Sequence, residues 1–242
     1  MIEIKDFSKS YGTFKAVDSL DLVIENGDIY GFIGHNGAGK TTTIKAITGI
    51  HRIEHGDILI DGISMKNSPL ECKKNIAYIP DTPDMYEFMT GRRYINFIAD
   101  IYGVSEETRK KRFAEYCDRF DMKNALDSKI GTYSHGMKQK LAIIAALCHE
   151  PKNIIMDEPF VGLDPKASHA VKETMRDLCA EGVCIFFSTH VLEVAEKLCN
   201  RIAIIKKGSL IESGDIEKVK GNSSLEDIFL ELTDSFGGDE SK

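Results

Sequence analysis

The chain has 242 residues, a formal net charge of −7 and 42% hydrophobic residues. This length and composition suffice for one large domain or two small ones with an ordinary hydrophobic core. Because nucleic-acid-binding proteins usually present a basic surface, the acidic balance argues against DNA or RNA as a partner.

Cysteine usage and apolar runs indicate the compartment. The six cysteines are scattered and none forms a Cys-x-x-Cys pair, so we expect reduced, buried thiols and no disulfide framework. The opening Met-Ile-Glu-Ile-Lys is typical of a strand and not of a signal peptide. The longest strongly apolar run, residues 141–148, is shorter than the roughly 20 residues that a membrane-spanning helix needs. We therefore expect a cytoplasmic protein, or one held at a membrane by a partner.

Strand and helix patterns alternate through the first and last thirds of the chain. Residues 2–7 and 20–25 alternate apolar and charged side chains, as half-buried strands do. Short apolar runs predict further strands at 29–33, 56–61, 75–80, 153–156, 183–187, 202–206 and 210–212. Helical patterns occupy 41–49, 165–180, 191–198 and 224–232. This alternation predicts an α/β fold with a mostly parallel sheet.

The middle of the chain differs, because residues 91–147 have helical periodicity and almost no strand signal. Ser105 begins one helix, with acidic residues in its first turn. Ser134 precedes another helix, which runs to about Cys148 and is ended by Pro151. We interpret this block as a helical insertion into the sheet domain.

A complete phosphate-binding loop follows the strand predicted at 29–33. Its pattern, Gly-x-x-x-x-Gly-Lys-Thr, is made by Gly34, His35, Asn36, Gly37, Ala38, Gly39, Lys40 and Thr41, with Thr42 next. Glycines let successive backbone N–H groups turn toward phosphate oxygens, and the N-terminus of the following helix adds partial positive charge. Lys40 suits the β- and γ-phosphates, Thr41 suits Mg²⁺, and Thr42 offers another donor to phosphate.

Two carboxylates end the strand predicted at 153–156, namely Asp157 and Glu158. Open α/β sheets bind ligands at the carboxyl ends of their strands. Phosphoryl transfer needs a carboxylate for the metal and a residue that activates water. We therefore expect Asp157 in the Mg²⁺ shell and Glu158 as the general base for the attacking water.

His190 follows the strand predicted at 183–187. A histidine at a strand end can bond the γ-phosphate and hold the base and the water in line. Taken alone, such a histidine is more often an ordinary surface residue. Beside the loop and the carboxylates, it is expected to act with Glu158 and Lys40 in catalysis.

Together these residues resemble the ATP-binding subunit of an ABC transporter, a P-loop NTPase, over roughly residues 2–232. Tyr11 is similar to the aromatic residue that stacks on adenine in that family. Residues 34–42 are similar to its Walker A loop, 154–158 to Walker B, 162–164 to the D-loop, and His190 to the switch histidine. The family signature Leu-Ser-Gly-Gly-Gln falls at 133–137, which places Ser134, His135, Gly136 and Met137 among the nucleotide-binding residues.

The chain departs from the family pattern at two places. His135 replaces the first signature glycine and Met137 its glutamine, while Ser134 and Gly136 are kept. Asp81 stands where the Q-loop glutamine belongs, so the resemblance implies a carboxylate near Mg²⁺. Both departures are similar to the ABC-2-type exporter branch, and residues 81–87 and 226–233 look most like the Ecs-type ATPases.

The resemblance also implies an organisation. It predicts one ABC ATPase domain over 1–242, with a RecA-like α/β core at 1–89 and 150–232 that includes an N-terminal antiparallel β part. The helical subdomain would span 90–149 and a flexible tail 233–242. Family members sandwich ATP between two subunits arranged head to tail, as homodimers or heterodimers, and act on a separate membrane permease. This chain would then lie at the inner face of the membrane, with residues 81–93 and the helical insertion toward the permease, which selects the substrate.

Three alternatives stay open at this point. An ABC ATPase acting on ribosomes or DNA would generally carry two ATPase domains or a long coiled-coil insertion. A GTPase would need an Asn-Lys-x-Asp guanine reader, which the sequence lacks, and a small-molecule kinase would leave residues 134–139 and His190 unexplained. A regulatory subunit that does not hydrolyse ATP is compatible with His135 and Asp81.

Overall fold

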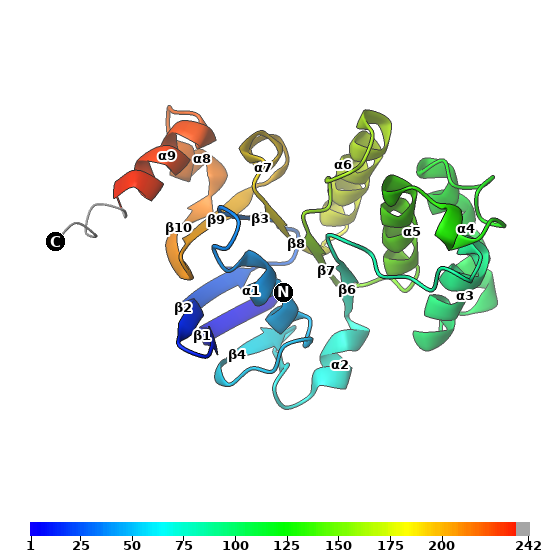
Figure 1. Cartoon of the computed structure of the whole chain (residues 1–242), viewed down its shortest axis with the longest axis horizontal. Helices are drawn as coiled ribbons and strands as arrows, with labels where there is room; N and C mark the ends of the chain where they lie inside the picture. Colours follow the sequence, from blue (N-terminus) through cyan, green and yellow to red (C-terminus); the bar gives the residue numbers. More distant parts are fainter. Residues whose placement is uncertain (236–242) are drawn as a thin grey trace.

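A computed structural model describes residues 1–235 of the chain (Figure 1). The described residues form two β-sheets, one of six strands and one of four, with helices around them. Figure 1 shows α3, α4 and α5 grouped at one end of the molecule, and α8 and α9 at the other. The α/β fold predicted from the sequence is confirmed.

The six-stranded sheet has the order β10-β9-β3-β8-β7-β6. All its neighbouring pairs are parallel except β9 with β10, which is antiparallel. The strands are β3 (Ile29–Ile33), β6 (Ile76–Ile79), β7 (Asn153–Asp157), β8 (Cys184–Thr189), β9 (Arg201–Lys206) and β10 (Ser209–Asp215). The central strands are buried along their whole length, which explains why the sequence shows continuous apolar runs there instead of alternation.

The four-stranded sheet is antiparallel throughout, with the order β2-β1-β4-β5. Its strands are β1 (Ile2–Tyr11), β2 (Phe14–Ile24), β4 (His55–Ile60) and β5 (Ile63–Ser64). Its apolar face packs with helix α1 (Lys40–Ile47) and with Tyr30 and Phe32 of β3 in one buried cluster. Ile29 and Ile33 point to the opposite face of the large sheet, in the second cluster. Helix α1 thus packs in one buried cluster with strands of both sheets.

The helical block lies between β6 and β7. It consists of α3 (Gly91–Ile101), α4 (Glu106–Arg119), a 3₁₀ turn at Ile130–Thr132, and α5 (His135–Leu147). Thr90, Ser105 and Ser134 cap α3, α4 and α5, because each side-chain oxygen accepts a hydrogen bond from a backbone N–H of the first turn. The helix starts predicted at Ser105 and Ser134 are therefore confirmed.

The helices that follow the helical block in the chain are α6 (Pro165–Ala180), α7 (Leu192–Leu198), α8 (Ile216–Lys220) and α9 (Leu225–Ser235). The helices α2 (Pro69–Lys74) and α8 and the strand β5 have no counterpart among the expected elements, because each is at most six residues long and so shows no full period.

The last helix corrects one expectation. α9 continues to Ser235 and buries Thr233, so residues 233–235 are helical and do not belong to a polar tail. Residues 236–242, which complete the expected tail, lie outside the described residues. Between residues 1 and 235, none of the helices combines the length and the apolar character that crossing a bilayer requires.

Candidate nucleotide site

The candidate site lies at the carboxyl edge of three adjacent parallel strands. In the sheet, β3 pairs with β8 and β8 with β7, so that Ile33 lies beside Thr189 and Asp157 beside Ser188. The loop after β3 and the carboxylates at the end of β7 therefore meet, although about 120 residues separate them in the sequence. This is the edge at which open α/β sheets bind ligands.

The loop between β3 and α1 depends on glycine at several positions. Gly37 and Gly39 have φ angles of 82° and 112°, a region that favours glycine. A Cβ atom at Gly34 would lie 2.5 Å from the Ile205 carbonyl oxygen, and one at Gly39 would lie 2.6 Å from that of Ala16. The conformation is therefore available only to a glycine-rich sequence.

Lys40 is 6% exposed and its ammonium group is held by the loop itself. Its Nζ donates hydrogen bonds to the carbonyl oxygens of Gly34, at 2.7 Å, and His35, at 3.2 Å. Glu158 Oε1 lies 3.7 Å from Nζ. Burial lowers the pKa of Lys40, while Glu158 and then Asp157 oppose that shift. A buried cation whose partners are mostly neutral carbonyls is suited to an anionic ligand.

Asp157 and Glu158 are tied to the neighbouring strand by one hydroxyl. Ser188 Oγ donates to Asp157 Oδ1 and accepts from the Glu158 N–H at 3.0 Å. Asp157 is buried, and Glu158 has a φ of 46°, which is strained for a residue with a side chain. Sequence reasoning missed Ser188, whose only signal was its place one residue past the predicted end of β8.

His190 meets Glu158 directly. Its Nδ1 lies 3.0 Å from Glu158 Oε1. The imidazole comes from the end of β8 and the carboxylate from the end of β7. The structure therefore places His190 beside the carboxylate with which the sequence associates it.

One cavity of about 300 Å³ collects most of the expected residues. The lining side chains come from four segments: Tyr11, Phe14 and Ala16; His35, Asn36, Gly37, Gly39, Lys40, Thr41 and Thr42; Asp81; and Asp157 with Glu158. Gly34 and Ala38 belong to the same loop and are buried. Ser134, His135, Gly136 and Met137 are not among the lining residues.

Two aromatic residues, Tyr11 and Phe14, line this cavity. Tyr11 is 47% exposed and Phe14 is 62% exposed. The Tyr11 hydroxyl makes a 2.9 Å hydrogen bond with His51 Nε2, and the two rings meet edge to face at 6.0 Å. Phe14 was not singled out from the sequence, since an isolated exposed phenylalanine carries no pattern.

Asp81 lines the same cavity. Burial raises the pKa of Tyr78 to about 12, and the negative charges of Asp157 and then Asp81 add smaller contributions. The charge of Asp81 therefore also acts on Tyr78. The fully buried Gln139 of α5 donates from Nε2 to the Pro80 carbonyl oxygen at 3.5 Å. The segment that carries Asp81 is therefore in contact with the helix that begins at the signature.

The signature residues form the N-terminus of α5. Ser134 Oγ accepts from the Met137 N–H at 3.2 Å. His135 packs on the backbone of Gly162, where an added Cβ atom would lie 2.3 Å from His135 Cδ2. A Cβ atom at Gly136 would lie 2.8 Å from the Gly162 carbonyl oxygen. The signature thus contacts the D-loop segment of its own chain.

The oxygen donors at the cavity fit a magnesium ion. Thr41, Asp81 and Asp157 supply one hydroxyl and two carboxylates. Within residues 1–235, no group of three or more His, Cys, Asp or Glu side chains forms a metal cage. Mg²⁺ at phosphate sites commonly takes only one or two carboxylates and completes its shell with phosphate oxygens and water.

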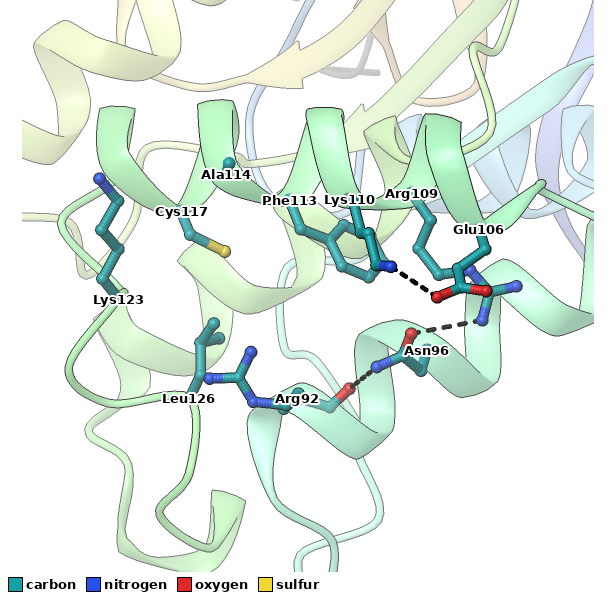
Figure 2. A pocket seen from close by; sticks show the side chains of 10 residues that line it. All are labelled: Arg92, Asn96, Glu106, Arg109, Lys110, Phe113, Ala114, Cys117, Lys123 and Leu126. Carbon is teal, nitrogen blue, oxygen red and sulfur yellow. Dashed lines mark hydrogen bonds and ion pairs between the residues drawn. The ribbon is translucent and has the colours of Figure 1, made fainter.

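A second cavity, of about 670 Å³, lies between α3 and α4 (Figure 2). Each of its cationic side chains already has a carboxylate partner: Arg92 with Asp127, Arg109 with Asp100, Lys110 with Glu106, and Lys123 with Asp118. Because these charges are compensated, the cavity lacks the net positive field of an anion site. The smaller cavity is the candidate site.

Comparison with known proteins agrees with this geometry. The ABC transporter family matches residues 17–161 of the chain. The chain is 34% identical to the ABC-type transporter ATP-binding protein EcsA of Bacillus subtilis (strain 168), over 99% of each sequence. A solved structure of the ATP-binding subunit of an ABC transporter has a TM-score of 0.93 and 36% identity, covering 96% of this chain and 99% of that one.

A third likeness concerns the fold alone. The dimeric structure of a post-hydrolysis state of the ATP-binding cassette MJ0796, bound to ADP and Pi, has a TM-score of 0.80 at 23% identity. It covers 89% of this chain and 99% of that one. The chain belongs to the ABC transporter family, which confirms the resemblance predicted from the motifs. It is an ATP-binding and ATP-hydrolysing subunit of such a transporter.

Proposed function

We propose that this subunit hydrolyses Mg²⁺–ATP in a composite site that a second subunit completes. The observation that carries the proposal is the single cavity in which Tyr11, the phosphate loop, Asp157 and Glu158 meet while residues 134–137 are absent from its lining. In the proposed division, residues 1–89 and 150–232 form the core that binds ATP. Residues 90–149 form the helical subdomain that presents the signature to the other subunit.

Nucleotide binding is assigned to residues 34–42 and Tyr11. Loop N–H groups and the N-terminus of α1 face the phosphates, and Lys40 pairs with the β- and γ-phosphates when it leaves the loop carbonyls. The exposed ring of Tyr11 offers a stacking face to adenine. Thr42 lines the same cavity and adds a donor.

The proposed Mg²⁺ ligands from the protein are Thr41 and Asp157, with Asp81 close to the same shell. When bound, the ion neutralises charge on the phosphates. Ser188 fixes the orientation of the Asp157 carboxylate toward the cavity, because it occupies Oδ1 from the side of β8.

Hydrolysis is assigned to Glu158 with His190. Glu158 stands at the end of β7 and lines the cavity, where its carboxylate can take a proton from the attacking water. His190 Nδ1, 3.0 Å from that carboxylate, holds its orientation. Lys40, the third catalytic residue in this proposal, stabilises charge on the γ-phosphate.

The second half of the site is proposed to come from residues 134–137 of another subunit arranged head to tail. Ser134 and the Gly136 N–H lie at the N-terminus of α5, which favours a phosphate group. The cassette MJ0796, which shares this fold, is described as dimeric with ADP and Pi. His135 and Met137 occupy the same turn and would lie close to the γ-phosphate.

A membrane permease is the proposed second partner, and would hold this subunit at the inner face of the membrane. Support comes from an exposed aromatic group beside α3. Tyr86 is 49% exposed and Phe88 is 70% exposed, and the Tyr86 ring contacts both Phe88 and Phe97 of α3. Exposed apolar groups of this size are typical of interaction sites.

The decisive experiment replaces Glu158 with Gln. The variant keeps shape and neutralises the general base, so ATP binding should persist while hydrolysis falls at least a hundredfold. Glu181→Gln, on an exposed turn after α6, is the matched control and should keep normal hydrolysis. Hydrolysis at the wild-type rate in Glu158→Gln would overturn the base assignment. Wild-type protein that binds ATP but never hydrolyses it, even with its permease, would identify a regulatory subunit instead.

A further inference from the structure

The C-terminal helix α9 reaches the phosphate loop, about 190 residues away in the sequence. The ring of Phe229 meets the imidazole of His35 edge to face, with centroids 4.9 Å apart. Aromatic pairs in this arrangement are favourable beyond the area that they bury. A residue of the nucleotide cavity is therefore in contact with an element outside the nucleotide-binding segments.

α9 is well anchored where it makes this contact. Ser224 and Asp227 form a reciprocal cap at its start, since Ser224 Oγ donates to the carboxylate and accepts from the Asp227 N–H. Leu225, Phe229 and Thr233 follow at intervals of four residues and are all buried, so they form one face of the helix. Phe229 is thus held by the core and presents its ring to His35.

A second contact ties the same helix to the strand under the loop. Lys206 Nζ donates to the Thr233 carbonyl oxygen. Lys206 ends β9 and follows Ile205, the residue whose carbonyl oxygen closes against Gly34. α9 therefore braces both the loop and the strand on which the loop rests.

His35 occupies a central position in the loop. Its carbonyl oxygen accepts hydrogen bonds from the Ala38 N–H, at 3.1 Å, and from Lys40 Nζ, at 3.2 Å. The His35 side chain is exposed and lines the cavity. A contact that orients the His35 ring also restrains the loop backbone at this position, where the Ala38 N–H closes a turn on the His35 carbonyl.

We propose that α9 is a positioning element of the nucleotide site, in which Phe229 acts through His35 to hold the phosphate loop in its ATP-binding form. The inference rests on the proposed nucleotide site. It requires reciprocity: if docked α9 favours ATP, bound ATP must favour docked α9 by the same factor. Phe229 touches no reacting atom and is a positioning residue.

The first test is Phe229→Leu, which keeps an apolar side chain in the core and removes the ring. We expect the Kd for a non-hydrolysable ATP analogue to rise roughly three- to tenfold, the range of an aromatic pair. Leu230→Ala is the matched control, because Leu230 is the next residue of α9 and is 50% exposed. Its Kd should equal that of the wild type.

The second test combines Phe229→Leu with His35→Ala. If Phe229 acts through the His35 ring, Phe229→Leu has no further effect on the Kd once that ring is gone. Equal and additive effects of Phe229→Leu in both backgrounds would overturn the proposal. This comparison stays informative if Phe229→Leu also lowers the melting temperature, because the Kd is measured well below it.

Hydrogen exchange of the α9 amides tests reciprocity directly. The ATP analogue should slow exchange in α9 of the wild type, and this protection should fall in Phe229→Leu by the factor lost in affinity. Analogue binding to the wild type without any protection of α9 would overturn the inference and leave the proposed function standing. Failure of the wild type to bind the analogue would contradict the proposed function instead.

Discussion

The Ser188 hydroxyl donates a hydrogen bond to Asp157 Oδ1 and at the same time accepts one from the Glu158 N–H. Ser188→Ala removes both bonds and leaves a buried carboxylate oxygen without this donor. Hydrogen bonds to charged groups contribute about 1.5–3 kcal/mol, so we expect ATP hydrolysis to fall roughly ten- to hundredfold. Steady-state phosphate release measures this loss.

The control for Ser188→Ala separates site geometry from folding. Ser209→Ala makes the same chemical change at an exposed position of β10 and should leave hydrolysis unchanged. Binding of ATP without Mg²⁺ should be nearly equal in both variants, because Ser188 acts on the carboxylates and not on the phosphate loop. Normal hydrolysis by Ser188→Ala would refute the orienting role.

The strands that carry the site are predictable from sequence for a physical reason. β3, β7 and β8 are buried along their length, so each appears as a continuous apolar run that ends at the glycine loop, the acidic pair or His190. The carboxyl ends of parallel neighbours must share one edge. That rule places the loop beside Asp157 and Glu158 before any coordinates are known, and comparison with relatives confirms the family.

Other contacts of the site carry no local sequence pattern. The Phe229–His35 pair and the Ser188–Asp157 bond depend on which elements become neighbours in space. Phe14 reaches the cavity because of the turn between β1 and β2, and nothing in its flanking residues marks it. The short helices α2 and α8 escape prediction because one helical turn shows no periodicity.

The contact between His135 and Gly162 yields a second prediction. Gly162 has a φ of 75°, and a Cβ atom there would lie 2.3 Å from His135 Cδ2. Gly182 has a φ of 88° with open space around it. Both Gly→Ala variants share the backbone strain, so Gly162→Ala should be less stable than Gly182→Ala by about 1 kcal/mol or more, from the added clash. Urea unfolding measures the two free energies.

The clash is specific to one imidazole, which permits a rescue. In a His135→Ala background, the Gly162→Ala and Gly182→Ala variants should lose similar stability, because only backbone strain remains. A difference that persists without His135 would show that another neighbour of Gly162 is responsible.

Tyr11 provides a third prediction, because its ring and its hydroxyl can be separated. Tyr11→Phe keeps the ring and loses the bond to His51, whereas Tyr11→Ala loses both. Base–aromatic stacking contributes about 1–3 kcal/mol, so Tyr11→Ala should raise the Kd for ATP at least about fivefold. Tyr11→Phe should raise it less than threefold. Equal losses in the two variants would assign the effect to the His51 bond, and no loss in either would remove Tyr11 from the adenine site.

His149 gives a pH prediction that is independent of nucleotide. Its ring stacks on Tyr102, with centroids 3.7 Å apart, and its Nε2 donates to the Ile76 carbonyl oxygen at 3.1 Å. Burial lowers the pKa of His149 to about 4, against a smaller opposing effect of that hydrogen bond. The folded state therefore holds the ring neutral, while the unfolded chain binds a proton near pH 6.5.

The direction of the effect follows from proton binding. Between about pH 6.5 and pH 4 the unfolded state carries one more proton at this site than the folded state, so the free energy of unfolding rises with pH. The contribution of the neutral His149 to the free energy of unfolding is fully present above pH 6.5, and it falls by roughly 3 kcal/mol as the pH drops to 4.

The variant His149→Gln removes the titration and keeps a donor for Ile76. Its free energy of unfolding should therefore change less between pH 6.5 and pH 4 than that of the wild type. His169→Gln, at an exposed position of α6, should retain the wild-type slope. Parallel pH profiles for His149→Gln and the wild type in urea unfolding would show that His149 keeps an ordinary pKa in the folded protein.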